Sequence, residues 1–508
     1  MEKCPRRRLV SRHTHMETLK FDVLVIGAGF VGVSVGAGLA SHAGACRDND
    51  GLDHSRVQII EQGPECGAFW LGGHEALSLH SPHHRLPHDG GLAYDYPMFK
   101  TKHEVRDYMN RYAQNKGLAR CMSFGETVLR ISHEPEVDKD RPWRVATDKR
   151  ELRARRVVVA TGLNRQPHFP HIPGSEERAA RGGARALRHS WSVSSCDEYK
   201  GERVLLVGSG NSAAELAVAL HHSGAKSIDI LVDGPRHFVR RSTMGQIFRL
   251  FPYVSLSTES MVHDLHRCTF GERTADAKVV TAWERFQEGQ DEFIRLLSVD
   301  LGHFGIQRPP SWRHAEQQSV APRIPVYDVD QQRLPRSAGE GGIVGGSAAV
   351  GYGVIDLIKS GAVGIKRGRI ERFTSTGVVI EEGASRHATA RAGAAKALAA
   401  EAATTKAATA EAATTALPGG THHAYDAVIL ATGFRHRMAD FLCAKDGLLH
   451  TAASFGAADD AQDDADGAPI IDSCSRSRVI DSIYFVGMDQ FRSTASLDCL
   501  TDDLSDDL

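Results

Sequence analysis

The chain lacks an apolar run of about 20 residues, so no transmembrane helix is predicted. It also lacks a large net charge, because 61 lysines and arginines nearly balance 63 aspartates and glutamates and leave a net charge of −2. Composition therefore predicts neither a nucleic-acid partner nor a basic membrane-binding surface. The nine cysteines are scattered along the sequence, with no two close together, which excludes a local CxxC or CxxxxC redox pair and a CxxC zinc site. We predict a soluble protein with reduced thiols and a cytoplasmic location.

Three segments are predicted to carry no chemistry. The basic leader, residues 1–19, has no apolar core and is not a secretory signal. We interpret it as disordered, with a weak organelle address as the alternative. Residues 384–417 form an alanine-rich insert of low complexity, and residues 456–467 are acidic and solvated. The remaining length is enough for two to four domains.

A glycine-rich turn follows the first apolar strand, in "VLVIGAGFVGVSVGAGLA" at residues 23–40. Gly27 permits a tight turn, Gly29 lets backbone approach a pyrophosphate, and Gly32 allows close packing of helix and strand. Glu61 ends the next strand, where a carboxylate can accept ribose hydroxyls, and the loop at 44–56 accounts for its long spacing from the turn. A glycine-rich packing face is the alternative, but it does not explain Glu61. We predict a dinucleotide site here.

The same pattern recurs in "VLLVGSGNSAAELAVAL" at residues 204–220. Gly208 and Gly210 repeat the first two glycines, and Ala213 replaces the third, a tolerated variant. Helix capping by the Ser and Asn of this turn is the alternative. The strands "RRVVVATGL" and "YDAVILATGF" complete the repeat. We predict an α/β fold with two doubly wound Rossmann-like domains, one inserted in the other, and electron transfer between two cofactors.

Further motifs follow in a characteristic order. They are "IGAGFVG", "EQGPECGAFW", "VVVATG", "PHFPHIPG", "HSW", "GERVLLVGSGNSAAELA" and "YDAVILATGF". These motifs and their order along residues 20–490 resemble those of the flavin-containing monooxygenases. The segments "FGIQRP", "RIPVYDVD", "IKSGAVGIKRGRIERF" and "SIYFVGM" are most similar to the YUCCA-type branch, which converts indole-3-pyruvate to the auxin indole-3-acetate.

The resemblance implies how the domains and cofactors are arranged. The FAD-binding domain would comprise residues 20–172 and 435–508, and the inserted NAD(P)H-binding domain residues 173–434. A helical insert on the substrate side would span about 244–320. FAD would contact residues of the first turn and its surroundings: Gly27, Gly29, Gly32, Glu61, Trp70, Ala160, Thr161, Gly162 and Gly487. The nicotinamide coenzyme would contact residues of the second turn: Gly208, Gly210, Asn211, Ser212, Asp233 and Arg236.

The resemblance also implies a reaction. An FAD- and NAD(P)H-dependent monooxygenase inserts one oxygen atom from O2 into a small organic substrate through a flavin C4a-hydroperoxide. The substrate reaction would be oxidative decarboxylation of indole-3-pyruvate or N- or S-oxygenation. The flavin carries the chemistry, so no catalytic side chain is assigned. The alternatives are a Baeyer–Villiger-type oxygenase, a flavin-dependent NAD(P)H oxidoreductase or oxidase without oxygen transfer, and an inactive FAD-binding protein.

Three departures from the family pattern bear on activity. Asp233 occupies the position where the family normally has an arginine that binds the 2′-phosphate of NADPH. The carboxylate of Asp233 would repel this phosphate and so favour NADH, which lacks it. Arg236, Arg240 or Arg241 would compensate, and the family resemblance favours NADPH. The FxGxxxHS signature keeps its His189–Ser190 pair but has a displaced glycine. The chain after Gly487 is also short for the helix that completes the flavin site.

Histidines are densest at positions 74, 80, 83, 84 and 88. Their spacing fits no standard ligand set, so we predict no metal site. A loop over the flavin and a solvated surface are the two other interpretations. Lys359 and the basic residues 366–369 are interpreted as surface charges on a hairpin. The sequence does not indicate the oligomeric state.

Overall fold

The structure is a computed structural model of the chain, and it describes the parts that form the two domains. The described residues are 18–42, 56–80, 99–162, 164–182, 185–243, 294–309, 326–328, 353–381, 420–449, 477, 479–480 and 482–486. Several predicted features lie outside them: most of the leader, most of the insert at 244–320, the alanine-rich insert, and Gly487 with the chain end.

The first sheet is built around strand β1 (Leu19–Ile26), the apolar run before the first glycine turn. Its parallel strands have the order β3-β2-β1-β6, and β19 pairs with the C-terminal part of β6. β5 and β4 continue the sheet, with β5 antiparallel to both β6 and β4. The bounds are β2 Val57–Glu61, β3 Met122–Phe124, β4 Val128–His133, β5 Trp143–Thr147, β6 Glu151–Val159 and β19 Ile483–Phe485.

Both faces of this sheet are buried, which explains the continuous apolar run of β1. Val23 and Val25 pack into one core with helix α1 (Phe30–His42) and helix α2 (Lys102–Asn115). Leu24 and Ile26 pack into a second core on the opposite face. The α2 N-terminus is fixed by a capping box between Thr101 and Glu104. Short 3₁₀ helices, η1 (Ala68–Leu71) and η4 (Leu118–Cys121), complete this lobe.

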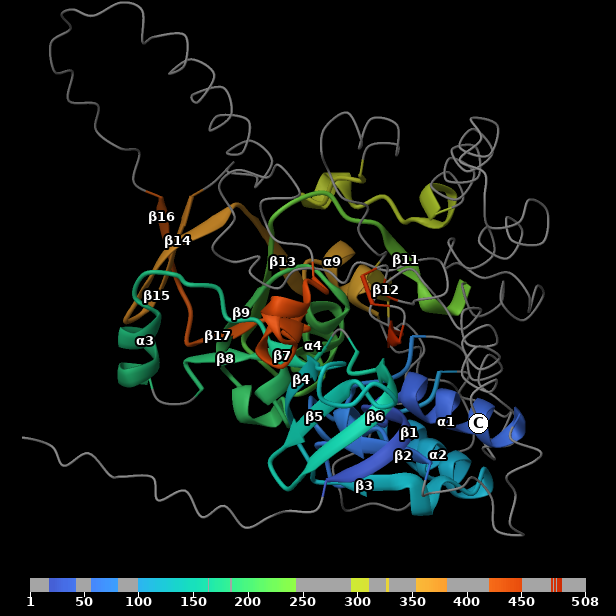
Figure 1. Ribbon diagram of the computed structural model, residues 1–508. Coiled ribbons are helices and arrows are strands. Elements are labelled where there is room, and N and C mark those ends of the chain that lie inside the picture. The colour runs from blue at the N-terminus through green and yellow to red at the C-terminus, as the bar shows by residue number, and fades with distance from the viewer. Residues whose placement is uncertain are drawn as a thin grey trace, which may run out of the picture.

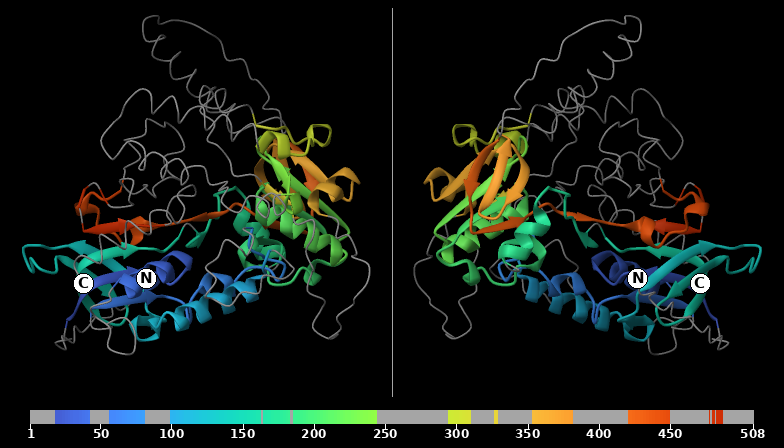
Figure 2. Two further views of the ribbon diagram at one scale, coloured as in Figure 1. Left: turned by 90° about the vertical axis from the view of Figure 1, so that its right-hand side faces the viewer. Right: turned by 90° about the vertical axis from the view of Figure 1, so that its left-hand side faces the viewer.

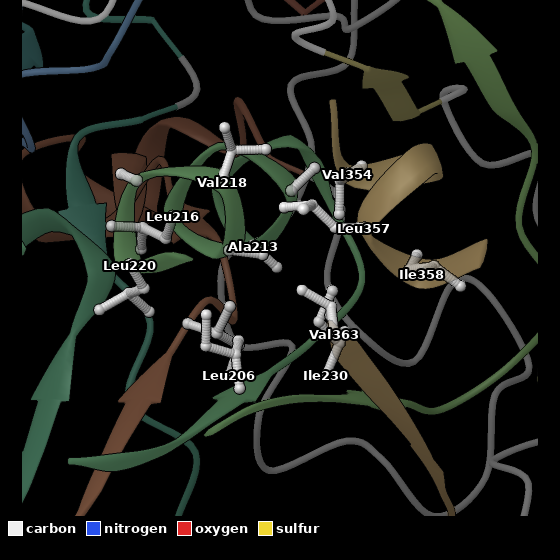
Figure 3. Packing of buried hydrophobic residues seen from close by; sticks show 14 of the residues in the cluster. Leu206, Ala213, Leu216, Val218, Leu220, Ile230, Val354, Leu357, Ile358 and Val363 are labelled. Atoms are coloured by element: carbon white, nitrogen blue, oxygen red, sulfur yellow. The ribbon is translucent and has the colours of Figure 1, made fainter. Parts of the chain in front are cut away.

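The second sheet is entirely parallel, with the order β13-β10-β9-β17-β8. Helix α4 (Asn211–His222) and helix α9 (Val354–Lys359) cover one face. Figure 3 shows Leu216 and Leu220 of α4, Leu357 of α9 and the strand residues Leu206 and Ile230 in this core. The strand bounds are β8 Leu187–His189, β9 Arg203–Val207, β10 Ser227–Val232, β13 Val363–Arg367 and β17 Ala427–Leu430.

An antiparallel sheet, β14-β15-β16, covers the other face of the second sheet with helix α3 (Ser175–Gly182). Its strands are β14 Arg369–Thr374, β15 Gly377–Glu381 and β16 Thr421–Ala424. β11 (Phe238–Arg240) pairs with β12 (Val326–Asp328) beside the main sheet. The remaining 3₁₀ helices are η5 Ser190–Ser192, η6 Asp197–Tyr199, η7 Gly302–Phe304, η8 Met438–Asp440 and η9 Ala444–Asp446.

Two chain segments connect the lobes, because the second domain is inserted in the first. β7 (Gln166–Pro167) leads out, β18 (Phe434–Arg435) leads back, and the two pair antiparallel. Figures 1 and 2 show the lobe with β1 in blue and cyan and the other lobe mainly in green and orange. The predicted fold class, two Rossmann-like domains with one inserted, is confirmed. The domain boundaries at 172/173 and 434/435 stay a prediction.

None of the helices in the described ranges has the length and apolarity needed to cross a membrane.

Candidate cofactor sites

The first glycine turn forms one wall of a cavity of about 550 Å³, named cavity I here. Gly27 has a φ of 105°, and a Cβ atom there would lie 2.6 Å from the carbonyl oxygen of Ala160. A Cβ on Gly32 would lie 1.9 Å from the carbonyl oxygen of Gly27, so helix and strand pack as predicted. Gly29 instead has no atom within 4 Å of its Cβ position and faces the cavity. The turn is therefore closely packed at Gly27 and Gly32, and it leaves space for a ligand at Gly29.

The other predicted residues of this site lie around the same cavity. Glu61, Trp70 and the turn Ala160-Thr161-Gly162 all line cavity I. The Glu61 carboxylate accepts hydrogen bonds from the N–H groups of Ala28 (2.8 Å) and Gly63 (2.7 Å), which fixes it at the end of β2. The buried Thr161 hydroxyl has no hydrogen-bond partner among the described residues. Of the residues predicted for FAD, all but two thus line one cavity; Gly32 supports it, and Gly487 is not described.

The second glycine turn repeats two features of the first: one closely packed glycine and one open glycine. Gly208 has a φ of 109°, and its Cβ position lies 2.5 Å from the carbonyl oxygen of Ala431. Gly210 has nothing within 4 Å, like Gly29. Gly210 is also the N-cap of α4 and makes no side-chain cap bond, so the first N–H groups of the helix have no side-chain cap. This turn lines a cavity of about 670 Å³, named cavity III.

Charged side chains surround cavity III. Asp233 and Arg236 both line it, as the sequence predicted, and Arg236 Nε donates to Ser209 Oγ over 3.1 Å. Arg369 and Arg435 line it too. The basic segment at 366–369 was interpreted as surface charge; that interpretation misses Arg369, which is exposed but faces this cavity.

The suggestion that Arg240 or Arg241 compensates for Asp233 is wrong. Arg240 pairs with Asp356, with its Nη1 3.1 Å from Oδ2 of that carboxylate. Arg241 is buried, donates to Ser78 Oγ over 2.7 Å and lies 4.5 Å from the centre of the Phe99 ring. Neither arginine lines cavity III.

A third cavity, of about 340 Å³ and named cavity II, lies between the other two. It shares Phe69, Trp70, Asn164 and Trp191 with cavity I and Phe434 with cavity III. Asn211 and Ser212, predicted for the coenzyme, line cavity II rather than cavity III. The rings of Phe69 and Trp191 are stacked, with their centroids 4.3 Å apart. Cavity II, with aromatic residues in its wall, therefore adjoins both the cavity of the first glycine turn and that of the second.

His189 of the His-Ser pair holds the wall of cavity II in place. Its Nδ1 accepts from the N–H of Trp191 (3.1 Å), and its Nε2 lies 2.9 Å from the carbonyl oxygen of Gly433. These contacts define a neutral imidazole that donates from Nε2. Burial lowers the pKa of His189 to about 4. The displaced glycine of the signature leaves this histidine in a structural position.

The predicted histidine cluster is only partly described. His74 and His80 line cavity II and face the carboxylate of Glu215, with Nε2 to oxygen distances of 3.4 and 3.5 Å. The interpretation of these two as solvated surface residues is wrong, because His74 is buried and His80 is partly buried. Histidines 83, 84 and 88 lie outside the described residues. Within the described ranges, no group of three or more His, Cys, Asp or Glu is placed to hold a metal.

Sequence reasoning missed Glu215, Arg369 and Asn164. Glu215 did have a signal, because it is the one charged residue in the apolar run "AAELAVAL" of a buried helix. Arg369 and Asn164 had none, since each reaches its cavity only through the packing of distant segments.

Comparisons with known proteins agree with this geometry. A family model described as pyridine nucleotide-disulphide oxidoreductase matches residues 93–275. Indole-3-pyruvate monooxygenase YUCCA1 of Oryza sativa subsp. japonica is 27% identical over 379 residues, which is 72% of this chain and 74% of the relative. Dimethylaniline monooxygenase [N-oxide-forming] 4 of Mus musculus is 31% identical over 138 residues, which is 26% of this chain and 24% of the relative.

Solved structures share the fold across nearly the whole chain. A flavin-containing monooxygenase from Stenotrophomonas maltophilia matches with a TM-score of 0.52 and 18% identity, covering 96% of both chains. An open structure of cyclohexanone monooxygenase matches with a TM-score of 0.55 and 17% identity, covering 96% of this chain and 87% of the other.

The fold and the cavities define a protein with two domains of the dinucleotide-binding type, each with a glycine turn that lines a cavity. The relatives narrow this description: the chain is similar to flavin-dependent monooxygenases in sequence and in fold. A crystal structure of cyclohexanone monooxygenase from Rhodococcus sp. Phi1, 18% identical with a TM-score of 0.54, is bound to NADP+. The residues present fit the FAD and NADPH expected from the sequence, because each turn offers an open glycine at a helix N-terminus, as a pyrophosphate requires.

Proposed function

We propose that cavity I holds FAD, that cavity III holds the adenosine end of NADPH, and that the enzyme transfers one oxygen atom from O2 to a small organic substrate entering cavity II. The domain boundaries given above and the contact residues predicted from the sequence are part of this proposal. A cytoplasmic location is predicted on composition alone.

One observation carries the proposal: the three cavities are adjacent, because neighbouring cavities share wall residues. Trp70 and Asn164 line cavities I and II, and Phe434 lines cavities II and III. A coenzyme extended from cavity III toward cavity II would therefore bring its ring end near a flavin in cavity I. Such an arrangement supports electron transfer from one cofactor to the other.

When bound, the flavin supplies the redox and oxygen chemistry. The chain's own residues bind, orient and exclude water. Gly29 and Gly210 admit the pyrophosphates to the helix N-termini, and Glu61 accepts ribose hydroxyls with the lone pairs that its two backbone bonds leave. The stacked rings of Phe69 and Trp191 give cavity II an apolar wall, which would reduce the access of water to the reacting groups.

The arginines of cavity III support NADPH over NADH. Arg236 is oriented by Ser209, and Arg369 lines the same cavity from the start of β14. Two guanidinium groups outweigh the single carboxylate of Asp233 for a doubly charged 2′-phosphate. We infer that Asp233 lowers but does not reverse the preference for NADPH.

The substrate is best sought among small aromatic compounds. The walls of cavity II include Phe69, Trp70, Trp191 and Phe434, which suit a flat ring. The YUCCA relatives are named for indole-3-pyruvate, and oxidative decarboxylation of that keto acid is our first candidate reaction. N- or S-oxygenation is the second, because the mouse relative is named for N-oxide formation.

The test uses purified holoenzyme under ¹⁸O2 with indole-3-pyruvate, an amine, a sulfide and a cyclic ketone. We expect one labelled oxygen atom in a product for each NADPH consumed, with indole-3-acetate formed fastest. A labelled lactone from the ketone alone would assign the Baeyer–Villiger reaction instead. Hydrogen peroxide equal to NADPH consumed, with no labelled product from any substrate, would contradict oxygen transfer and leave an oxidase.

A further inference from the structure

Helix α4 carries a buried carboxylate that the proposed cofactor contacts do not use. Glu215 is 1% exposed and lines cavity II one turn after the start of α4. Its Oε1 accepts from Ser78 Oγ over 3.4 Å, and its Oε2 has no well-aligned hydrogen-bond partner among the described residues. A buried carboxylate is costly to maintain without full pairing, so this one calls for a functional explanation.

The groups around Glu215 keep it negative toward the cavity. Burial alone would raise its pKa, but the hydrogen bond from His74 and the positive charges of His80, His74 and Arg241 lower it below its usual value. Burial lowers the pKa of His80, and Arg241 adds to that effect while Glu215 opposes it. Arg241, the permanent positive charge, is absent from the lining of cavity II.

Glu215 lies on the side of the glycine turn where we expect the nicotinamide end of the coenzyme. Gly208 and Gly210 line cavity III, whereas Asn211 and Ser212, the next residues, line cavity II together with Glu215. A dinucleotide with its pyrophosphate at this turn extends its ring end into cavity II. This step rests on the proposed function. The ring carries one positive charge in NADP⁺ and none in NADPH.

We propose that Glu215 is the electrostatic partner of the nicotinamide ring and makes the protein bind NADP⁺ more tightly than NADPH. The carboxylate stabilises the charged ring inside a low-dielectric cavity, where water cannot screen the interaction. His74 and His80, from the segment before α2, and Arg241, after β11, set the remaining charge around it.

The experiment measures binding without turnover. Holoenzyme is photoreduced anaerobically, and NADP⁺ and NADPH are each titrated by calorimetry at pH 8. In wild type we expect NADP⁺ to bind more tightly than NADPH by about tenfold. Glu215→Gln should remove this preference by weakening NADP⁺ about tenfold while changing NADPH by less than about twofold. Asp229→Asn is the matched control, because it removes a carboxylate that is hydrogen-bonded to Tyr425 and does not line cavity II.

Glu215→Asp keeps the charge at a greater distance and should give an intermediate preference, which also covers the case in which Glu215→Gln does not fold. Equal weakening of both coenzyme forms by Glu215→Gln would overturn the inference and leave a structural role. Equal affinities in wild type would overturn it as well. If wild type binds neither coenzyme form, the proposed function itself fails, and the two failures are thereby distinguished.

Discussion

The guanidinium of Arg236 donates a hydrogen bond from Nε to the hydroxyl of Ser209 over 3.1 Å. This bond joins the loop after β10 to the glycine turn after β9. It orients the guanidinium at the edge of cavity III, which both residues line. The relationship links the ends of two neighbouring parallel strands and defines where the coenzyme's 2′-phosphate is expected.

Replacing Arg236 should therefore alter coenzyme choice. Arg236→Gln removes a charge-assisted contact to the 2′-phosphate, so kcat/KM for NADPH should fall about 10- to 100-fold while NADH is little affected. Anaerobic flavin reduction with each coenzyme measures this. Asp233→Asn should act in the opposite direction and raise the NADPH/NADH ratio. Equal losses for both coenzymes in Arg236→Gln would contradict a 2′-phosphate contact.

The open space at Gly29 predicts a selective loss of flavin. Gly29→Ala meets no protein atom within 4 Å, so the protein should fold, but the methyl group occupies the approach of the pyrophosphate. We expect flavin content to fall at least about tenfold with a nearly unchanged circular dichroism spectrum. Gly32→Ala is the contrasting variant, since its Cβ would lie 1.9 Å from the Gly27 carbonyl oxygen. It should lose folded protein, and full flavin content in Gly29→Ala would count against the site.

His189 predicts a pH dependence of stability. Its pKa is about 4 in the folded protein because it is buried, against about 6.5 when unfolded. The unfolded chain therefore binds the proton more readily. The stabilising contribution is complete above a pH of about 6.5 and is lost as the pH falls toward 4, by roughly 3 kcal/mol in total.

Urea unfolding of wild type and His189→Asn at pH 7.5, 5.5 and 4.5 measures this contribution. The variant should be less stable at pH 7.5, and its stability should fall less steeply in acid. His103→Asn is the control, because His103 is 52% exposed and pairs with the half-exposed Glu75. Parallel pH curves for wild type and His189→Asn would refute the assignment.

Arg178 is expected to be essential for the stability of the inserted domain. Its side chain is 2% exposed and donates only to backbone carbonyl groups among the described residues. These belong to Ala186, Thr374, Gly377, Tyr425 and Asp426. Arg178→Met leaves these acceptors unpaired, which should cost about 3 kcal/mol or more.

Thermal unfolding monitored by circular dichroism checks the Arg178 prediction. Arg185→Met is the matched control, since Arg185 is about half exposed and should change the unfolding free energy by less than about 0.5 kcal/mol. A similar Tm in Arg178→Met and wild type would show that the carbonyl groups find other partners.

The sequence was sufficient where the chemistry is local. Gly27, Gly29 and Gly32 lie within one turn, and Glu61 follows at the end of the adjacent strand, so spacing alone indicates a site. The repeat around Gly208 was visible for the same reason. Its contacts with Ala431 arise because both turns close against the end of the same kind of buried strand.

The sequence was insufficient where distant segments meet. Arg369 reaches cavity III because β13 pairs with β10 at the edge of the sheet, a register that local patterns do not encode. His74 and His80 meet Glu215, which lies far along the chain, only because the inserted domain packs against the first. Their spacing alone therefore suggested surface residues or a flavin loop, and not partners of a buried carboxylate.

The most direct test of the two-cofactor account is anaerobic bleaching of the flavin band near about 450 nm by NADPH, in wild type and in Gly210→Ala. Gly210, like Gly29, is open toward its cavity, so the variant should keep its flavin but obstruct the coenzyme. We predict a yellow wild-type protein that NADPH bleaches, and a yellow variant that needs at least about tenfold more NADPH for the same rate. A colourless wild-type protein that cannot take up FAD, or a variant bleached as readily as wild type, would contradict the account.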